Sequence, residues 1–281
     1  MRLATIRVDG GTRAARVHDD HLTLLAAPDV GALLADPSWP DAIGTGRLPA
    51  TGTGRLPLES ADYAPLVPNP SKILCVGLNY RGHILEMGRD LPSVPTLFAK
   101  FAASLVGARD RLVLPAVSDQ VDWEAELAVL VGRPIRRATA TEASTAIAGY
   151  SVLNDVSMRD WQWRTSQWLQ GKTFEASTPL GPWLSTPDEV GDAADLEVRC
   201  EVDGVMVQRA RTSDLLFRPA EVLAYVSRFI TLVPGDVVAT GTPAGVGAGR
   251  EPKTFLRPGQ VLRTAIEGLG ECVNECVREA E

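Results

Sequence analysis

Cysteine and histidine are scarce in this chain, whose 281 residues include four cysteines and three histidines. The cysteines are widely spread and form no CxxC pair, which argues against a zinc cluster and against a disulfide framework. All four are expected to be reduced thiols, as in a cytoplasmic protein. They are Cys75, Cys200, Cys272 and Cys276.

The sequence also lacks a membrane-spanning run and a basic stripe. No uninterrupted apolar stretch reaches the ~18–20 residues that a transmembrane helix needs, and the charged N-terminus has no apolar signal-peptide core. The net charge is −7 and the pI about 5.1, which argues against nucleic acid as a partner. With 45% hydrophobic and 22% charged residues, the composition is that of a globular protein.

The first 70 residues differ in texture from the rest. Residues 4–8 and 14–17 are predicted strands joined by a glycine-containing turn, and proline and glycine accumulate after residue 35. The hexapeptide Gly-Thr-Gly-Arg-Leu-Pro occurs at 44–49 and again at 52–57, which indicates a local duplication in a linker. A domain boundary is therefore predicted near residue 70.

This boundary gives a small N-terminal domain over residues 1–70 and a larger domain over residues 71–281. The larger domain has a mainly β pattern in which strands and helices do not alternate regularly, which argues against a doubly wound sheet or a TIM barrel. Its predicted strands span 73–78, 121–131, 196–207 (a hairpin turning at Asp203-Gly204), 237–240 and 260–266.

Two helices are predicted in the larger domain. One covers residues 141–148. The other starts near Pro219, a residue suited to a first helical turn. Its apolar face is expected to carry Val222, Leu223, Val226, Phe229 and Ile230. The predicted fold class is α+β, mainly β.

Glu124 and Glu126 form a Glu-x-Glu pair within the predicted strand 121–131. Because side chains alternate along a strand, both carboxylates face the same side, about 6.6 Å apart along the backbone. Two acids in so apolar a strand need compensation, and a hard divalent cation would supply it. The alternative is a solvated sheet edge, which the apolar continuation 127–131 disfavours.

Asp155 follows an apolar strand at the point where it ends in a polar turn. As a third carboxylate it would complete half of an octahedral Mg²⁺ or Mn²⁺ shell and leave positions for water and substrate. By itself, Asp155 is more typical of a residue that caps the following turn.

His83 and Glu86 are neighbours if this segment is helical, since they stand at positions i and i+3. A carboxylate beside an imidazole fixes its tautomer and raises its basicity, so the pair could act as a general base on water. Taken alone, it is also an ordinary surface ion pair.

Lys172 could present a cation to an oxyanion or to a substrate carboxylate, or it could be a solvated lysine in a loop. The glycine-rich stretch 240–247 follows a strand but lacks the Gly-Lys-Ser/Thr ending of a P-loop, which argues against a nucleotide site. Its amides could still hold a small anion.

Taken in order, these segments resemble the fumarylacetoacetate hydrolase family, in its acylpyruvase and 2-hydroxyhepta-2,4-diene-1,7-dioate isomerase-like branch. The resemblance covers residues 72–276. It rests on Gly77-Leu78-Asn79-Tyr80-Arg81 with His83, Asp122-Trp123-Glu124-Ala125-Glu126-Leu127, Asn154-Asp155-Val156-Ser157 with Arg159-Asp160, Gly171-Lys172-Thr173-Phe174, Pro179-Leu180-Gly181-Pro182-Trp183, and Pro234 to Pro243 with Gly245-Val246-Gly247.

The resemblance implies a mixed β-sandwich roll with a small N-terminal β-rich domain, in a cytoplasmic homodimer. It implies Mg²⁺ or Mn²⁺ held by Glu124, Glu126 and Asp155. It further implies a lid dyad of His83 and Glu86 that activates water, with Lys172 assisting. The substrate contacts that it implies are Arg159, Gln162 and Thr242.

Two positions depart from the family pattern. Gly82 stands where the family often has aspartate before the dyad histidine, and Glu175 also stands where aspartate is frequent. The first departure is expected to loosen the lid, while neither removes a metal ligand or a dyad member. Glycines and prolines punctuate residues 81–94, so this lid is predicted to be mobile without ligand.

The predicted activity is metal-dependent hydrolysis of a C–C bond in a β-diketo acid such as an acylpyruvate or a fumarylpyruvate-like compound, through a metal-stabilised enolate. The partner is then a small keto acid. The same site would also serve an oxaloacetate-type decarboxylase, a dienedioate isomerase or tautomerase of aromatic catabolism, or a specialised biosynthetic member of the family. A non-catalytic binding protein is disfavoured, because no metal ligand and no dyad residue is missing.

Overall fold

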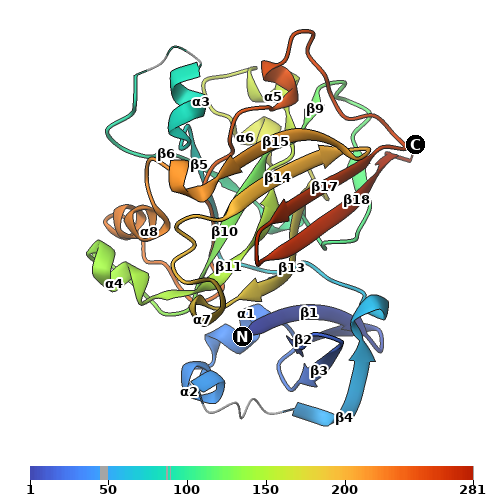
Figure 1. Ribbon diagram of the computed structural model, residues 1–281, viewed down its shortest axis with the longest axis vertical. Helices are drawn as coiled ribbons and strands as arrows, with labels where there is room; N and C mark the ends of the chain where they lie inside the picture. The colour runs from blue at the N-terminus through green and yellow to red at the C-terminus, as the bar shows by residue number, and fades with distance from the viewer. Residues whose placement is uncertain (45–49, 87, 89, 281) are drawn as a thin grey trace.

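The computed structural model describes residues 1–44, 50–86, 88 and 90–280 (Figure 1). An eleven-stranded mixed sheet runs through most of the protein, in the order β4-β3-β2-β1-β13-β11-β10-β16-β5-β6, with β7 beside β13. Its strands are β1 Arg2–Val8, β2 Gly11–Val17, β3 His21–Leu25, β4 Ala50–Pro57, β5 Ile73–Gly77, β6 Thr96–Lys100, β7 Leu105–Val106, β10 Ala125–Val131, β11 Ile147–Asn154, β13 Thr178–Ser185 and β16 Val237–Ala239.

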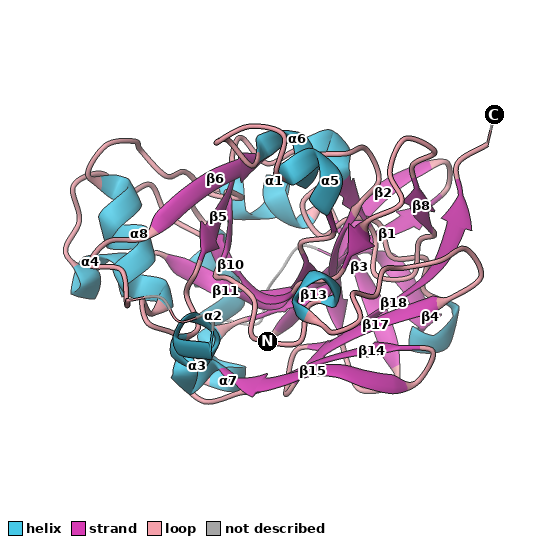
Figure 2. Ribbon diagram, turned by 90° about the horizontal axis from the view of Figure 1, so that it is seen from above, coloured by secondary structure: helices cyan, strands magenta, loops and turns pink. Residues whose placement is uncertain are grey.

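A second sheet of five strands, in the order β15-β14-β17-β18-β8, packs on β10, β11 and β13. Figure 2 shows this sheet on one side of those strands and helices α5 and α6 on the other. The result is a mainly β mixed sandwich, as predicted. The five strands are β8 Leu112–Leu114, β14 Glu197–Val202, β15 Val205–Arg211, β17 Val261–Ile266 and β18 Gly270–Arg278, and a separate short pair consists of β9 Val121–Asp122 and β12 Ser157–Met158.

The helices are short, and within the described residues none is long and apolar enough to cross a membrane. The α-helices are α1 Val30–Ala35, α2 Trp39–Gly44, α3 Arg81–Glu86, α4 Ala140–Ser144, α5 Arg159–Gln162, α6 Leu169–Lys172, α7 Pro187–Val190 and α8 Pro219–Ser227. Single 3-10 turns lie at Leu58–Ser60, Ala102–Ser104, Thr212–Asp214 and Gly247–Gly249.

The N-terminal 70 residues continue the large sheet, because β1 pairs with β13 (Arg2 with Ser185 and Leu3 with Leu184). The predicted linker interpretation of the repeated hexapeptide is wrong for its second copy, which lies in β4 and pairs with β3. There Leu56 pairs with the buried Leu22 and packs, partly buried, against the core, where a linker would expose it. The first copy lies largely outside the described residues.

Strand β10 lies between two apolar layers. Leu127 and Val129 contact the core shared with β14 and β17, whereas Ala128 and Leu130 contact the core shared with β5 and β16. The prediction that the sequence 127–131 is not a solvated edge is thereby confirmed. Because both faces are covered, the polar residues at the start of this strand are also removed from bulk water.

Two helix predictions need correction at their C-terminal ends. Helix α4 begins at the Thr139–Glu142 capping box but ends at Ser144, because β11 begins at Ile147. Helix α8 begins at Pro219 and ends at Ser227, so Phe229 and Ile230 lie beyond it and are 57% and 38% exposed. The apolar spacing continued past the residue where the hydrogen-bonded helix ends. The hairpin turning at Asp203-Gly204 is confirmed.

Candidate active site

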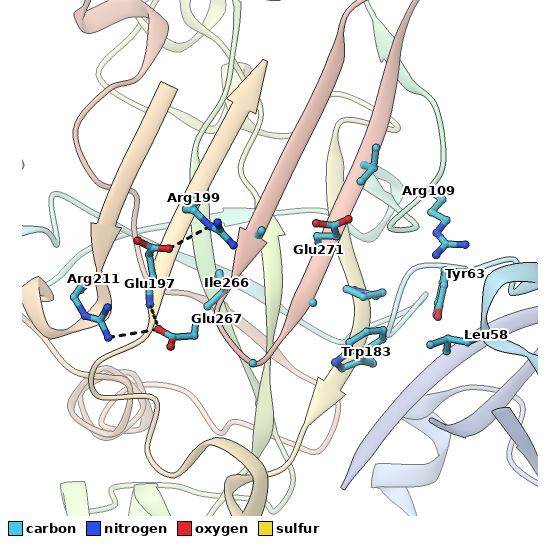
Figure 3. A pocket seen from close by; sticks show the side chains of 15 residues that line it. Leu58, Tyr63, Arg109, Trp183, Glu197, Arg199, Arg211, Ile266, Glu267 and Glu271 are labelled. Atoms are coloured by element: carbon cyan, nitrogen blue, oxygen red, sulfur yellow. Dashed lines mark hydrogen bonds and ion pairs between the residues drawn. The ribbon is translucent and has the colours of Figure 1, made fainter. Parts of the chain in front are cut away.

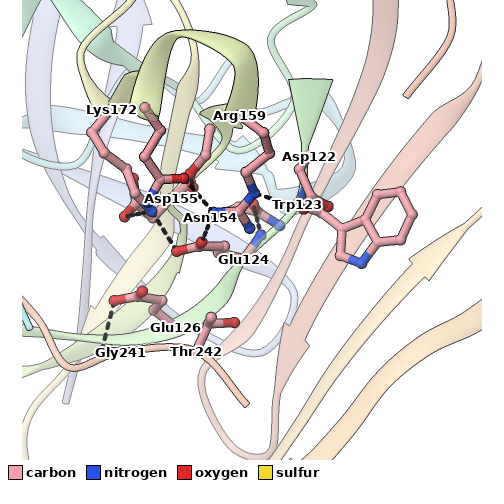
Figure 4. Close-up of polar contacts among 12 residues, drawn as sticks. Asp122, Trp123, Glu124, Glu126, Asn154, Asp155, Arg159, Lys172, Gly241 and Thr242 are labelled. Atoms are coloured by element: carbon pink, nitrogen blue, oxygen red, sulfur yellow. Dashed lines mark hydrogen bonds and ion pairs between the residues drawn. The ribbon is translucent and has the colours of Figure 1, made fainter. Parts of the chain in front are cut away.

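Three buried carboxylates converge where the start of β10 lies beside the end of β11. Glu126 is the second residue of β10, Glu124 immediately precedes that strand, and Asp155 immediately follows β11. One oxygen of each carboxylate lies within 4.8 Å of the others (Figure 4). The sequence therefore identified a real cluster, and it is buried rather than on a solvated edge.

The single strand predicted over residues 121–131 is wrong in one detail, because β9 and β10 are separated by Trp123 and Glu124. At this break, side-chain oxygens accept the hydrogen bonds that backbone amides would otherwise donate to a neighbouring strand. The amide of Trp123 donates to Asp122 (2.8 Å), and the amide of Glu124 donates to the side chain of Asn154 (2.9 Å). Despite the interruption, the Glu124 carboxylate stays on the same side as that of Glu126 and faces Asp155 as well (Figure 4).

Three buried cationic side chains form ion pairs with two of the three carboxylates. The Nζ of Lys172 lies 2.6 Å from Glu124 and 2.9 Å from Asp155, and the Nζ of Lys100 lies 2.6 Å from the second oxygen of Asp155. Arg159 reaches the second oxygen of Glu124 at 2.6 Å. Helix α5 supplies Arg159 and helix α6 supplies Lys172. Lys172 is therefore a buried, ion-paired lysine at the end of a helix, and the alternative of a solvated loop lysine is wrong.

These contacts set the charge states of the acids. Burial opposes ionisation of Asp155, but Lys100 and Lys172 outweigh it and lower the pKa of its carboxyl. Burial, reinforced by the negative charges of Asp155 and Glu124, raises the pKa of Glu126 well above its ordinary value. Burial also opposes protonation of Lys172, yet the facing carboxylates raise its pKa. The cluster is thus compensated on one side only, around Glu124 and Asp155.

Glu126 is the part of the cluster that a cation would complete. Its Oε2 accepts a hydrogen bond from the amide of Gly241 (2.8 Å), and its Oε1 has no hydrogen-bond donor within the described part of the chain. The residue is 1% exposed, so an ionised carboxylate there needs a partner. Three convergent oxygen donors fit a hard divalent cation such as Mg²⁺ or Mn²⁺.

The glycine-rich loop after β16 binds carboxylates of the protein itself. The amide of Gly241 donates to Glu126, while the amides of Gly247 and Ala248 donate to the two oxygens of Asp122, at 2.6 and 2.9 Å. Two of the amides expected to hold a small external anion, those of Gly241 and Gly247, are therefore occupied in this structure, and they fix the loop against the acid cluster.

A cavity of about 530 Å³ opens onto the cluster. The predicted substrate contacts Arg159, Gln162 and Thr242 all line it, together with Lys172. The side-chain oxygen of Gln162 accepts from Arg159 (2.8 Å), and the hydroxyl of Thr242 accepts from Gln208 (2.8 Å). The structure thus brings seven of the nine predicted site residues to one place: Glu124, Glu126, Asp155, Arg159, Gln162, Lys172 and Thr242.

The remaining two, His83 and Glu86, lie on helix α3, but their side chains are outside the described residues. The helix itself is anchored at its start, where Arg81 donates to the carbonyl of Leu215 (2.5 Å) and the amide of Gly82 donates to Asp214 (3.0 Å). Residues 87 and 89 of the predicted lid are also outside the described chain, so its mobility stays a prediction.

A different cavity, of about 740 Å³, lies between the N-terminal region and the five-stranded sheet (Figure 3). Its charged side chains pair with one another, as in Arg199–Glu197 (3.3 Å) and Arg211–Glu267 (3.5 Å). No convergent acid cluster was found there among the described residues. The chemistry-bearing groups gather in the smaller cavity.

Sequence reasoning missed two buried charged residues of the site. Lys100 ends β6 in an apolar stretch that carries no signal for a buried lysine. Asp122 begins the motif Asp122-Trp123-Glu124-Ala125-Glu126-Leu127 and accepts four hydrogen bonds: one from Arg159 and three from backbone amides, those of Trp123, Gly247 and Ala248. An acidic residue two positions before the Glu-x-Glu pair, inside an apolar segment, was the available signal.

Replacing Asp122 with asparagine should destabilise the protein by about 3 kcal/mol, because an amide group would face donors that now meet a carboxylate and Arg159 would lose a buried counter-charge. Urea unfolding of the metal-free protein measures this. The exposed Asp119→Asn exchange, three residues away, is the matched control and should leave the midpoint unchanged. Equal midpoints for both variants would show that Asp122 does not hold the loop.

The comparisons with known proteins agree with this geometry. The family described as fumarylacetoacetate (FAA) hydrolase, C-terminal, matches residues 72–277. The human protein named oxaloacetate tautomerase FAHD2A, mitochondrial, is 46% identical over 213 residues, which are 75% of this chain and 68% of that protein. The 2,4-didehydro-3-deoxy-L-rhamnonate hydrolase of Sphingomonas sp. (strain SKA58) is 43% identical over 210 residues, 74% of each chain.

A solved structure shows the same fold over the whole length. The 5-carboxymethyl-2-hydroxymuconate delta-isomerase of Mycobacterium smegmatis superposes with a TM-score of 0.82 at 32% identity and covers 100% of both chains. These relatives are a tautomerase, a hydrolase and an isomerase by name. The match over residues 72–277 contains every residue of the acid cluster and of the cavity described above, and the chain belongs to the fumarylacetoacetate hydrolase family.

Proposed function

We propose that this enzyme uses a divalent cation to hydrolyse the C–C bond of a 2,4-dioxo acid such as an acylpyruvate. The convergence of Glu124, Glu126 and Asp155 within 4.8 Å, at the edge of a cavity lined by basic and polar side chains, is the observation that supports it. In the reaction, water adds to the carbonyl at C4, the C3–C4 bond breaks, and a carboxylic acid and pyruvate are released.

The chain's own residues can bind and orient such a substrate. Arg159 and Lys172 line the cavity as cations and can receive a carboxylate or a developing oxyanion. Gln162 and Thr242 offer hydrogen-bonding groups on the same wall. A divalent cation held by the three acids would supply Lewis-acid stabilisation of enolate charge. Negative charge develops at C3 of the substrate both in hydrolysis and in proton transfer, so the same stabilisation would serve either reaction.

His83 and Glu86 are the proposed base that takes the proton from the attacking water. We expect His83→Ala to lower kcat for hydrolysis by about 10²–10⁴-fold, the usual contribution of a general base. Because His83 is not among the three carboxylate ligands, Mn²⁺ affinity should stay unchanged in the same variant. Steady-state kinetics and calorimetric Mn²⁺ titration measure the two effects. A parallel loss of Mn²⁺ binding would contradict the assignment.

The direct test of the proposed reaction follows the enol absorbance of acetylpyruvate with Mg²⁺ and with a chelator. Cation-dependent loss of absorbance, with pyruvate and acetate formed in equal amounts, is the expected result. Absence of both products in protein shown to contain the cation would exclude acylpyruvate hydrolysis.

Tautomerisation of a 2-oxo diacid is the second candidate, favoured by 46% identity to oxaloacetate tautomerase FAHD2A. This reaction moves a proton between C3 and the C2 oxygen and needs no water. Exchange of the C3 protons of oxaloacetate for deuterium, followed by NMR with and without enzyme, detects it. Faster exchange without pyruvate formation would identify a tautomerase and separate it from a decarboxylase.

We also propose that the enzyme acts as a cytoplasmic homodimer on small keto acids. Size-exclusion chromatography with light scattering tests the dimer.

A further inference from the structure

Arg250 is a cation of the active-site cavity that has no acidic partner among the described residues. It lines the same cavity as Glu124, Glu126 and Lys172. Its Nε donates to the carbonyl of Gly245 (3.2 Å) and its Nη2 to the carbonyl of Val207 (2.8 Å), and its guanidinium lies over the ring of Trp123. Within the described residues no carboxylate pairs with it, so its charge is available to a ligand.

The other cations of the site differ in this respect. Lys100, Lys172 and Arg159 each pair with one or two carboxylates at 2.6–2.9 Å. Together these three face four buried acids, Asp122, Glu124, Glu126 and Asp155. Counted over these described side chains, with all four acids ionised, a divalent cation at the cluster would change the net charge from −1 to +1, and Arg250 would raise it to +2. A ligand with two negative charges would balance the site.

The position of Arg250 is fixed before any ligand binds. Its loop is tied to Asp122 through the amides of Gly247 and Ala248, and Gly245 lies so close to β15 that a Cβ there would come within 2.2 Å of the Val207 carbonyl. The same carbonyl accepts from Arg250. A side chain held in this way loses little further freedom on binding a carboxylate.

Aromatic rings line another part of the cavity. Phe98, Trp163 and Trp168 border it, and Trp168 packs edge-to-face on both of the others. Trp168 also approaches Gly77 so closely that a Cβ there would lie 2.4 Å from the ring. These surfaces suit an apolar carbon chain, and a cavity of about 530 Å³ is large enough for a seven-carbon diacid.

We propose that Arg250 binds a second carboxylate, at the end of the substrate away from the acid cluster, and that the enzyme therefore selects dicarboxylic over monocarboxylic 2-oxo acids. This inference rests on the proposed function, in which the 2-oxo acid end lies at the acid cluster. A planar guanidinium gives two parallel hydrogen bonds to a carboxylate, which a lysine ammonium reproduces only in part.

A binding experiment tests this without requiring turnover. The Mn²⁺-loaded enzyme is titrated calorimetrically with 2-oxoheptanedioate and with 2-oxoheptanoate, which have the same length, carry no 4-oxo group and differ by one terminal carboxylate. We expect the wild type to bind the diacid at least about 10-fold more tightly. Arg250→Gln should abolish that preference while leaving the affinity for the monoacid unchanged, and Arg250→Lys should retain part of it.

The exposed Arg257→Gln exchange is the matched control and should keep the wild-type preference. Equal weakening of both ligands by Arg250→Gln would show that Arg250 only supports its loop and would overturn the proposal. So would a wild type that binds both ligands equally. Because neither ligand can be cleaved as a 2,4-dioxo acid, the binding preference can be found even if acylpyruvate hydrolysis is not.

If hydrolysis is confirmed, a second pair of compounds measures specificity. For 2,4-dioxoheptanedioate and 2,4-dioxoheptanoate, Arg250→Gln should lower kcat/KM for the diacid about 10–100-fold, mainly through KM, and leave the monoacid within about 3-fold. A fall in kcat for both compounds would instead assign Arg250 to the chemistry, against the proposal.

Discussion

Replacing Glu126 with glutamine is expected to lower turnover by about 10³-fold, roughly 4 kcal/mol of transition-state stabilisation. Glutamine keeps an oxygen that can accept from the amide of Gly241, so the local backbone is preserved. It removes the carboxylate of the cluster that, within the described residues, has no lysine or arginine partner and lines the cavity. The affinity of the site for the cation falls when a charged ligand is removed.

Stability of the metal-free protein separates this explanation from simple misfolding. Burial raises the pKa of Glu126, so at neutral pH its ionisation costs folding free energy in the absence of a cation. Metal-free Glu126→Gln should therefore melt at or above the wild-type temperature, whereas the rise in melting temperature on adding Mn²⁺ should vanish.

The exposed Glu59→Gln exchange serves as the control for that experiment and should change neither quantity. A Glu126→Gln protein that still gains stability from Mn²⁺ as the wild type does would remove Glu126 from the cation site.

Local patterns predicted the mainly β fold class, whereas the union of Glu124, Glu126 and Asp155 in one site was predicted from the resemblance to the family, because each acid alone left a structural alternative open. The alternation in 125–131 and the polar turn after residue 154 are properties of short segments, and β10 and β11 follow them closely. The three acids come together only where the neighbouring ends of β10 and β11 meet in the folded sheet. The interruption at Trp123 and Glu124 was not predictable from the sequence, since it depends on Asn154 and Gln208 from distant strands.

The buried cations required the tertiary structure. Lys100 lies 55 residues from Asp155 in the chain, and nothing in the sequence around it marks it as buried. Arg250 likewise enters the cavity only because its loop folds back over Asp122. Residues whose function depends on a partner far away in the sequence have no periodic signal of their own, whereas the acids were visible through their unusual apolar surroundings.

Replacing Lys172 with methionine is expected to have the largest combined effect on stability and activity. Lys172 is 2% exposed and bridges Glu124 and Asp155 at 2.6 and 2.9 Å. Without it, two buried carboxylates lose a shared counter-charge, and the metal-free protein should unfold about 3–5 kcal/mol more easily. Denaturant unfolding measures this, with the exposed Lys253→Met exchange as the control that leaves stability unchanged.

Saturating Mn²⁺ distinguishes the structural role of Lys172 from its role toward substrate. A cation among the same carboxylates replaces part of the missing charge, so the added cation should restore more stability to Lys172→Met than it gives to the wild type. Turnover should stay about 10²-fold low in the same cation-saturated sample, because methionine cannot present a cation to an oxyanion or a substrate carboxylate. Recovery of turnover together with stability would show that Lys172 serves only to hold Glu124 and Asp155 in place.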